Sequence, residues 1–358
     1  MVPPAPKSNQ LLANSPVELL SGLDALYLSA QGTAPTVLFE HLEEGRSAAE
    51  EAGAPVDTTI GGYPLKVLPN SWQRYRYCAR HELARIGFTP SENLPVVRFQ
   101  PTAVALHALG PAGTVLWARN FLDACGVDAS LHVSRLDLHS DWQRLDFRAG
   151  ERRNFVTYSN RRALYEVDDQ MSGLTFGKRA GSLMCRIYDK SREMVDKGHD
   201  WWPDVWGSKY DPDEKVLRVE FEFSREGLRT FEVDTPEDAF AKMPALWAYA
   251  TQMWLSLRVP TNDETRSRWP VDPRWALVQA STLAGGCAPA ERIREGERQG
   301  ELRTLRKLAS GILSSIAVPL GTDDIGDTLQ AVGPELETYE RVSRRSFPDR
   351  IREKRQRR

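Results

Sequence analysis

Three short segments of the chain carry ionisable side chains at every second position, the spacing that places them on one face of a β-strand. In the segment 134–141, Leu136 and Leu138 would point to one face. The other face would carry one basic, one imidazole and two acidic side chains, Arg135, Asp137, His139 and Asp141. Two carboxylates and an imidazole at this spacing could surround a single cation, or they could form an ion-paired and solvated strand face.

The segment 184–190, MCRIYDK, places a tyrosine between two cations. Tyr188 would share a strand face with Arg186 and Lys190. Neighbouring positive charge favours the phenolate form of a tyrosine, whose ordinary pKa is about 10, and a phenolate is a nucleophile. A tyrosine in a strand also commonly serves only in packing, so this segment by itself leaves both interpretations open.

The segment 216–225, VLRVEFEFSR, alternates most regularly. One face would bury four apolar side chains, Leu217, Val219, Phe221 and Phe223. The other would carry four polar ones, Arg218, Glu220, Glu222 and Ser224. Carboxylates at this spacing can hold a hard cation such as Mg²⁺ or Mn²⁺, although a solvated surface face is the alternative. If the three strands are neighbours in one sheet, their polar faces suit metal-assisted attack on a phosphodiester by a tyrosine.

The elements that would position these residues are mixed strands and helices without a regular strand-helix repeat or a glycine-rich phosphate loop. This pattern favours an α+β fold with an antiparallel sheet, flanking helices and a C-terminal helical region. We expect a flexible arm over 1–20, the sheet domain over 21–260, the helical region over 261–340 and a basic tail over 341–358. The expected helices cover residues 37–53, ending at Gly53, then 112–126, 236–258, 289–308 and 326–343.

The composition is that of a globular protein, with 41% hydrophobic and 27% charged residues among 358. The formal net charge of −2 disfavours a protein that coats nucleic acid through a uniformly basic surface. Acidic and basic residues are nevertheless separated along the chain. Residues 1–60 hold two basic and eight acidic residues, whereas residues 341–358 hold nine basic and two acidic ones. No segment is apolar enough to cross a membrane, and four scattered cysteines predict no disulfide framework, so we expect a cytoplasmic protein.

In their order and spacing, the segments RLDLHSD, GLTFGKRAGSLMCRIYDK and VLRVEFEFSR resemble the motifs of the replication initiation factor (Rep-trans) family. This family comprises the rolling-circle initiators of small plasmids and the related relaxases of integrative conjugative elements. The resemblance extends over residues 22–260 and implies a DNA-nicking and strand-joining enzyme with a tyrosine nucleophile and bound Mg²⁺ or Mn²⁺. It further implies single-stranded or hairpin origin DNA as substrate, a homodimer, and a replication helicase or transfer machinery as partners.

Carried over by position, the resemblance makes Tyr188 the residue that forms a 5′-phosphotyrosyl link, flanked by the catalytic Lys190 and Arg186. The metal ligands that it implies are Asp137 and Glu220, with Glu222 and Asp141 as neighbours. Arg98 lies in VVRFQP, which resembles the arginine-containing strand that the family carries upstream, and Arg179 falls in the YFG-R element of the family. We expect both arginines to contact DNA. The chain departs from the family pattern at 175–177, where Thr-Phe-Gly replaces an aromatic-Phe-Gly, and at His139, which is an additional ligand or a surface histidine.

Basic residues also cluster outside these motifs. The stretch 144–162 holds six arginines that could contact DNA phosphates or form a solvated loop, Arg144, Arg148, Arg152, Arg153, Arg161 and Arg162. The tail 341–358 is typical of a disordered arm that raises affinity for nucleic acid. The segment 201–206, WWPDVW, favours hydrophobic packing over base stacking.

Three functions fit these observations. A rolling-circle initiator and a conjugative relaxase would use the same active site and differ in the fate of the nicked strand. A non-catalytic DNA-binding regulator would keep the sheet without the cutting activity, and the presence of Tyr188, Asp137, Glu220 and Lys190 argues against it.

Overall fold

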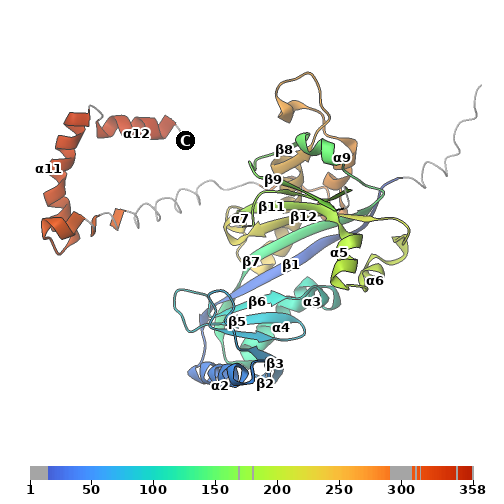
Figure 1. The fold of residues 1–358 in the computed structure, drawn as a ribbon, viewed down its shortest axis with the longest axis horizontal. Coiled ribbons are helices and arrows are strands. Elements are labelled where there is room, and N and C mark those ends of the chain that lie inside the picture. The colour runs from blue at the N-terminus through green and yellow to red at the C-terminus, as the bar shows by residue number, and fades with distance from the viewer. Residues whose placement is uncertain are drawn as a thin grey trace, which may run out of the picture. The chain divides into compact units, whose positions relative to one another are not determined.

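The computed structural model describes residues 15–167, 170–179, 181–290, 309–310, 313–314, 316–343 and 346–356 (Figure 1). The chain divides into two compact units, Met1–Arg292 and Ile293–Arg358, and each is described by itself. This boundary lies later than the one expected at residue 260. The reason is that α9 (Pro273–Gln279) belongs to the core of the first unit, where the indole of the fully buried Trp275 donates to the carbonyl of Thr251 at 2.8 Å.

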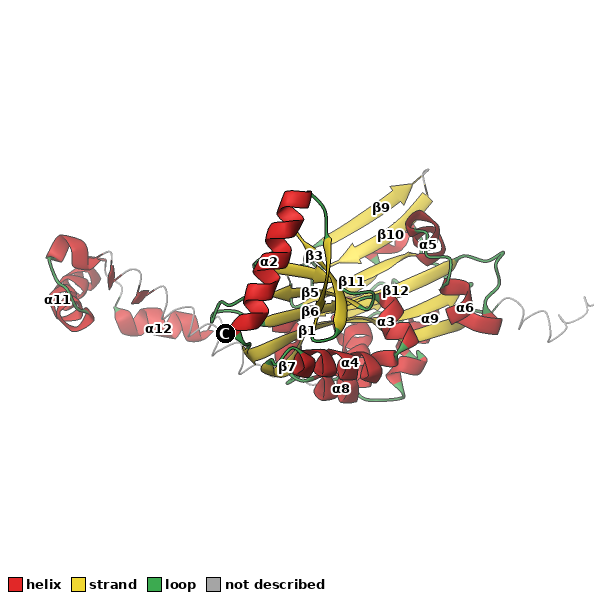
Figure 2. Cartoon of the chain, turned by 90° about the horizontal axis from the view of Figure 1, so that it is seen from below, coloured by secondary structure: helices red, strands yellow, loops and turns green. Residues whose placement is uncertain are grey.

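The first unit is built on an antiparallel sheet of eleven strands, which Figure 2 shows from below. In spatial order these are β2 (Val56–Ile60), β3 (Tyr63–Leu68), β4 (Tyr77–Arg80), β5 (Ala84–Phe88), β6 (Val97–Pro101), β1 (Val17–Thr33), β7 (Asp128–Gln143), β12 (Val216–Ser224), β11 (Leu183–Asp189), β10 (Gln170–Phe176) and β9 (Arg162–Val167). All neighbours pair antiparallel. The α+β class with an antiparallel sheet is therefore confirmed.

Helices cover the apolar face of this sheet. The main core contains apolar side chains of the strands and of six helices, which are α2 (Thr36–Ala52), α3 (Ala103–Ala108), α4 (Gly110–Ala124), α7 (Arg225–Arg229), α8 (Pro236–Ala248) and α9. Leu136, Leu138 and Phe221 have no exposed surface and belong to this core, as their alternation in the sequence predicts. Helix α2 ends at Gly53, whose φ of 63° is the left-handed C-cap expected there.

The opposite face of the sheet is covered at one end. Helices α5 (Lys190–Lys197) and α6 (Trp202–Trp206) follow β11, and α3 (Ala103–Ala108) follows β6. Trp202 and Trp206 of α6 pack with Leu19 of β1 and Val216 of β12 in a second hydrophobic cluster. The tryptophan-rich segment is thus packed inside the protein, as its composition favours.

The helix expected over 236–258 is wrong in its last part. After α8 the chain forms a π-helical turn (η3, Tyr249–Trp254) and then strand β13 (Leu255–Leu257), which pairs with β8 (Phe155–Thr157) in a separate two-stranded sheet. The strand buries Leu255 and Leu257, so tertiary packing overrides the local helical pattern. The shorter elements of this unit are η1 (Ala149–Arg153), η2 (Gly207–Lys209), α7 (Arg225–Arg229), η4 (Arg266–Arg268) and η5 (Thr282–Ala284).

The second unit contains α11 (Ile325–Ser343) and α12 (Phe347–Gln356). The first confirms the helix expected over 326–343, whereas most of the helix expected over 289–308 lies outside the described residues. Helix α12 corrects the expectation of a disordered tail, and the hydroxyl of Ser346 accepts the Asp349 amide in its first turn. The flexible arm expected over 1–20 is also corrected at its end, because strand β1 begins at Val17. In the described part of the chain, no helix has the length and apolarity needed to span a membrane.

Candidate active site

The three strands singled out by their alternation lie next to one another in the sheet, in the order β7, β12, β11. Their register places Glu222 opposite Asp137, and Glu220 opposite both His139 and Arg186. Tyr188 stands opposite Arg218. Because opposite residues in an antiparallel pair share a face, the polar side chains of all three segments gather on one side of the sheet.

Three carboxylates meet at the centre of this face. One oxygen atom from each of Asp24, Asp137 and Glu220 lies within 4.8 Å of the other two. Asp137 and Glu220 were expected from the sequence, and Asp24 of β1 was not. Asp24 lies in a β-bulge, because the register of β1 against β7 shifts between Leu23 and Ala25. A bulge turns a side chain out of strict alternation, and for this reason periodicity alone does not identify Asp24.

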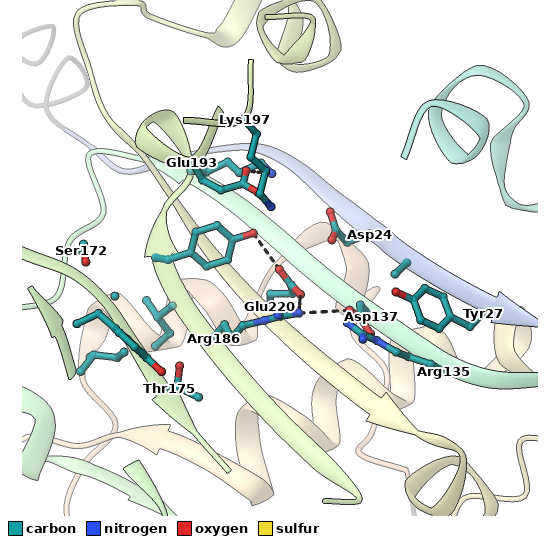
Figure 3. A pocket seen from close by; sticks show the side chains of 17 residues that line it. Asp24, Tyr27, Arg135, Asp137, Ser172, Thr175, Arg186, Glu193, Lys197 and Glu220 are labelled. Atoms are coloured by element: carbon teal, nitrogen blue, oxygen red, sulfur yellow. Dashed lines mark hydrogen bonds and ion pairs between the residues drawn. The ribbon is translucent and has the colours of Figure 1, made fainter. Parts of the chain in front are cut away.

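Arginine guanidinium groups surround the carboxylates (Figure 3). Arg186 forms ion pairs with Glu220 and with Asp137, the latter at 3.4 Å. Arg135 donates to Asp137 Oδ1 at 2.7 Å and lies 2.9 Å from Glu222 Oε2. Glu222 is therefore a neighbour of the three-carboxylate cluster and not one of its members.

Arg218 connects the cluster to a second, fully buried carboxylate. Its guanidinium contacts Asp24 and donates twice to Asp141, at 2.7 and 2.8 Å. The indole of Trp206 donates to Asp141 as well, at 2.8 Å. Asp141, which the sequence suggested as a neighbouring ligand, thus lies outside the cluster, where it holds the arginine that contacts Asp24.

The three clustered carboxyl groups have different affinities for protons. Burial raises the pKa of Asp137 to about 8, an effect that Arg135 opposes and Glu220 increases. Burial also raises the pKa of Glu220, and the nearby charge of Asp24 adds to this. Burial is also the largest single influence on Asp24 and opposes its ionisation, but Arg218 and smaller contributions from other nearby basic groups together outweigh burial and lower the pKa of Asp24 below its ordinary value. Asp137 and Glu220 therefore hold a proton more tightly than ordinary carboxyl groups do. A cation bound between them would neutralise the same buried negative charge.

The Tyr188 hydroxyl reaches the cluster, where it donates to Glu220 Oε2 at 3.0 Å. The other oxygen of the same carboxylate accepts from Arg186. The flanking cations do not favour the phenolate here, which corrects the expectation from the sequence. Burial, followed by the charge of Glu220, raises the pKa of Tyr188 well above its ordinary value, and Arg218 only partly opposes this.

Lys190, expected beside the tyrosine, is the first residue of α5, where the Asp189 side chain caps the helix by accepting the Arg192 amide. Its ammonium group donates to Glu193 Oε2 at 2.6 Å. It also lies 4.4 Å from the centre of the Trp202 ring, and the Arg218 guanidinium lies 4.5 Å from that ring. Trp202 thus fixes two cations beside the site.

His139 is buried, with 1% of its surface exposed, and this excludes the surface histidine that was one of the two alternatives. In the described structure neither ring nitrogen has a hydrogen-bond partner. Burial, followed by the charge of Arg218, lowers its pKa to about 4. The polar face of β7 is therefore not a solvated strand face at this end, because α6 and its neighbours cover it.

A cleft of about 550 Å³ opens onto the cluster (Figure 3). Its walls contain three tyrosines, Tyr27, Tyr165 and Tyr188, and all three clustered carboxylates. The catalytic residues expected from the sequence, Tyr188, Lys190 and Arg186, line this one cleft. Their roles stay predictions at this point.

The arginines expected to contact DNA fall into three groups. Arg161, Arg162 and Arg179 line a second cavity beside the cleft. Arg98 donates to Gln73 Oε1 at 2.6 Å and stacks 4.9 Å from the Trp72 ring. The rest, Arg144, Arg148, Arg152 and Arg153, line neither the cleft nor the second cavity.

Comparison with known proteins finds a likeness in structure but none in sequence. No family model matches the chain, and no curated protein matches it. The structure is similar to that of a rolling circle replication initiator protein from Geobacillus stearothermophilus, with 14% sequence identity and a TM-score of 0.46 over 76% of this chain and 98% of the other. A TM-score at this level does not support an inference about function, so the proposed function depends on the geometry of the cleft.

The clustered residues fit a hard divalent cation. Carboxylate oxygens are the ligands that Mg²⁺ and Mn²⁺ prefer, and three of them converge here from three strands. A positively charged group already lies at this cluster, because the Arg186 guanidinium is within 4 Å of Asp137, Glu220 and Glu222.

Proposed function

We propose that this protein is a DNA-nicking and strand-joining enzyme in which Tyr188 is the nucleophile and Asp24, Asp137 and Glu220 hold Mg²⁺ or Mn²⁺. The observation that supports this most strongly is the hydrogen bond from the Tyr188 hydroxyl to Glu220, a member of the three-carboxylate cluster, inside an open cleft. A nucleophile, a candidate proton acceptor and a candidate metal site thus meet at one place.

The reaction would be a transesterification. The Tyr188 oxygen forms a bond to phosphorus while the bond from phosphorus to the 3′ oxygen breaks, and that oxygen keeps the electron pair and takes a proton from solvent. The phenolic proton passes to Glu220, which already accepts the hydroxyl hydrogen bond. Arg186 and Lys190 would stabilise the charge on the phosphate. A bound divalent cation would supply further polarisation of the phosphate oxygens.

The 5′-phosphotyrosyl product conserves the energy of the broken phosphodiester, so the reverse reaction can join strands without another energy source. This chemistry serves both replication initiation and conjugative transfer, and we favour the rolling-circle initiator with the relaxase as the alternative. Single-stranded or hairpin origin DNA is the proposed substrate, because a side chain inside a cleft reaches only an unpaired strand in line.

A covalent-adduct assay tests this proposal. Purified protein is incubated with Mn²⁺ and oligonucleotides that tile the DNA flanking its gene, each labelled at one end, and resolved on a denaturing gel. The 3′ label should migrate with the protein and the 5′ label should not. Tyr188→Phe should abolish the adduct, whereas Tyr158→Phe, outside the cleft, should leave it unchanged. A binding protein without catalysis would give no adduct with either label.

A further inference from the structure

A second cavity, of about 700 Å³, adjoins the cleft. Tyr165, Thr175 and Arg186 line both, so the two share a wall formed by β9, β10 and β11. This volume is in the range of sites that hold a nucleotide-sized ligand. The reaction proposed for Tyr188 does not use this cavity, which raises the question of what it binds.

The lining of the second cavity is strongly basic. It contains five cationic side chains and no carboxylate, and the cations are Arg161, Arg162, Lys178, Arg179 and Arg186. Within the described parts of the chain, only Arg186 of these five forms an ion pair. The other four are exposed, and mutual repulsion of their charges would be relieved by an anion placed between them.

The fold fixes this arrangement through the β9–β10 hairpin and the turn after it. Arg162 stands opposite Phe176, and its guanidinium donates to the carbonyl of Arg152 at 3.1 Å. The Gly177 amide donates to the Arg161 carbonyl at 3.0 Å. Gly177 has a φ of 92°, and an added Cβ would lie 2.8 Å from the Leu183 carbonyl oxygen. Only glycine therefore lets the chain turn here and bring Lys178 and Arg179 beside the two arginines.

An aromatic side chain stands at the border between the two cavities. Tyr165 is 56% exposed although it lines both of them. An exposed ring beside phosphate-binding cations is the combination that proteins use to bind an unpaired nucleotide, with the base on the ring and the phosphates on the cations.

We propose that the second cavity binds the nucleotide next to the reacting phosphate, with Arg161, Arg162, Lys178 and Arg179 on its phosphates and Tyr165 stacked on its base. The position of this nucleotide relative to the nick depends on the proposed function, but its binding requires neither the metal nor the nucleophile. The ligand class is a single strand, because a paired base would first have to be unpaired and unstacked, at a cost in free energy, before it could stack on Tyr165.

The test measures binding without catalysis. Full-length Tyr188→Phe protein, in chelator, is titrated with a fluorescent single-stranded oligonucleotide at several salt concentrations. Adding Arg162→Gln and Arg179→Gln should weaken binding at least tenfold and reduce the salt slope by about 1.4, the value for two phosphate contacts on a single strand. The matched control, Arg80→Gln with Arg229→Gln, removes two exposed arginines that line neither cavity and should change the affinity little.

A second pair of variants isolates stacking. Tyr165→Leu should weaken binding of the single strand by about tenfold, and Tyr158→Leu, which is also exposed but lines neither cavity, should not. Equal losses in test and control variants would overturn the proposal, as would equal affinity for duplex and single strand, or saturation of the site by inorganic pyrophosphate alone. Because no nicking is measured, these results are independent of whether Tyr188 forms an adduct.

Discussion

Arg186 forms ion pairs with two of the three carboxylates that would hold the proposed divalent cation, Asp137 and Glu220. Its guanidinium lies within 4 Å of Asp137, Glu220 and Glu222, and 27% of its side chain is exposed where it lines the cleft. On binding of a cation, the freed guanidinium would be available to the phosphate of the DNA.

The first prediction concerns this competition. Arg186→Met keeps an unbranched apolar stem at this position but removes the guanidinium and its charge, leaving the carboxylates without that neutralising partner. We expect Mn²⁺ to bind at least tenfold more tightly, since a positive charge next to the site is lost. Calorimetric titration measures this, and Arg80→Met is the control. Unchanged or weaker Mn²⁺ binding would show that Arg186 does not compete with the metal.

The second prediction concerns His139. Its pKa of about 4 in the folded protein lies below the ordinary value of 6.5, so between these values the unfolded chain binds the additional proton. Stability is therefore lost as the pH falls from 6.5 toward 4, by about 3 kcal/mol from this group. In chelator, His139→Phe should show a shallower dependence of unfolding free energy on pH than the wild type. Equal slopes would contradict the assignment.

At the same scale, the sequence reveals most of the acidic cluster but not all of it. Alternation correctly predicts that Asp137 and Glu220 share a face with Tyr188. It cannot predict Asp24, because the bulge in β1 depends on the pairing of that strand with β7. It also cannot predict the protonation of Tyr188, which depends on burial and on the distance to Glu220.

At the scale of elements, helix α6 determines the environment of the site. Trp202 is 1% exposed and stacks with both Lys190 and Arg218, and Arg218 in turn contacts Asp24. The WWPDVW segment thus connects the packing of the sheet to the orientation of a candidate metal ligand. Its burial follows from its composition, but its position over the polar face does not, because that depends on how α5 and α6 fold back after β11.

The third prediction compares the two adjacent tryptophans of this segment. Trp202→Leu should lower the free energy of unfolding by roughly 2–4 kcal/mol, as large-to-small changes in a core do, and should also weaken Mn²⁺ binding through Arg218. Trp201→Leu, at a partly exposed position, should have a smaller effect on both. Chemical denaturation and metal titration provide the two measurements. If Trp202→Leu lowers stability but leaves metal affinity unchanged, the helix has only a packing role.

At the scale of the whole molecule, the basic residues of 341–358 belong to a different unit from the cleft. Composition predicts their charge correctly, but the helix α12 was not expected. The unit boundary after Arg292 was also not visible in the sequence, because the contribution of α9 to the core comes from tertiary contacts such as that of Trp275 with Thr251.

The fourth prediction concerns this tail. Removing residues 341–358 takes away nine basic residues and should weaken DNA binding and reduce its salt slope, because fewer counterions are released. The fraction of bound complex that forms an adduct should not change. The double variant Asp349→Asn with Glu353→Gln removes the two acidic residues of the tail instead, and it should increase the salt slope of DNA binding. An unchanged slope in both would show that the tail makes no contact with DNA.

The most direct test of the central claim identifies the residue that becomes attached to DNA. Three tyrosines, Tyr27, Tyr165 and Tyr188, line the cleft, so the adduct itself must be mapped. After adduct formation with Mn²⁺ and nuclease digestion, mass spectrometry should find a nucleotide on the peptide that contains Tyr188 and on neither of the other two. A nucleotide on Tyr27 or Tyr165, or none on any tyrosine, would contradict the account.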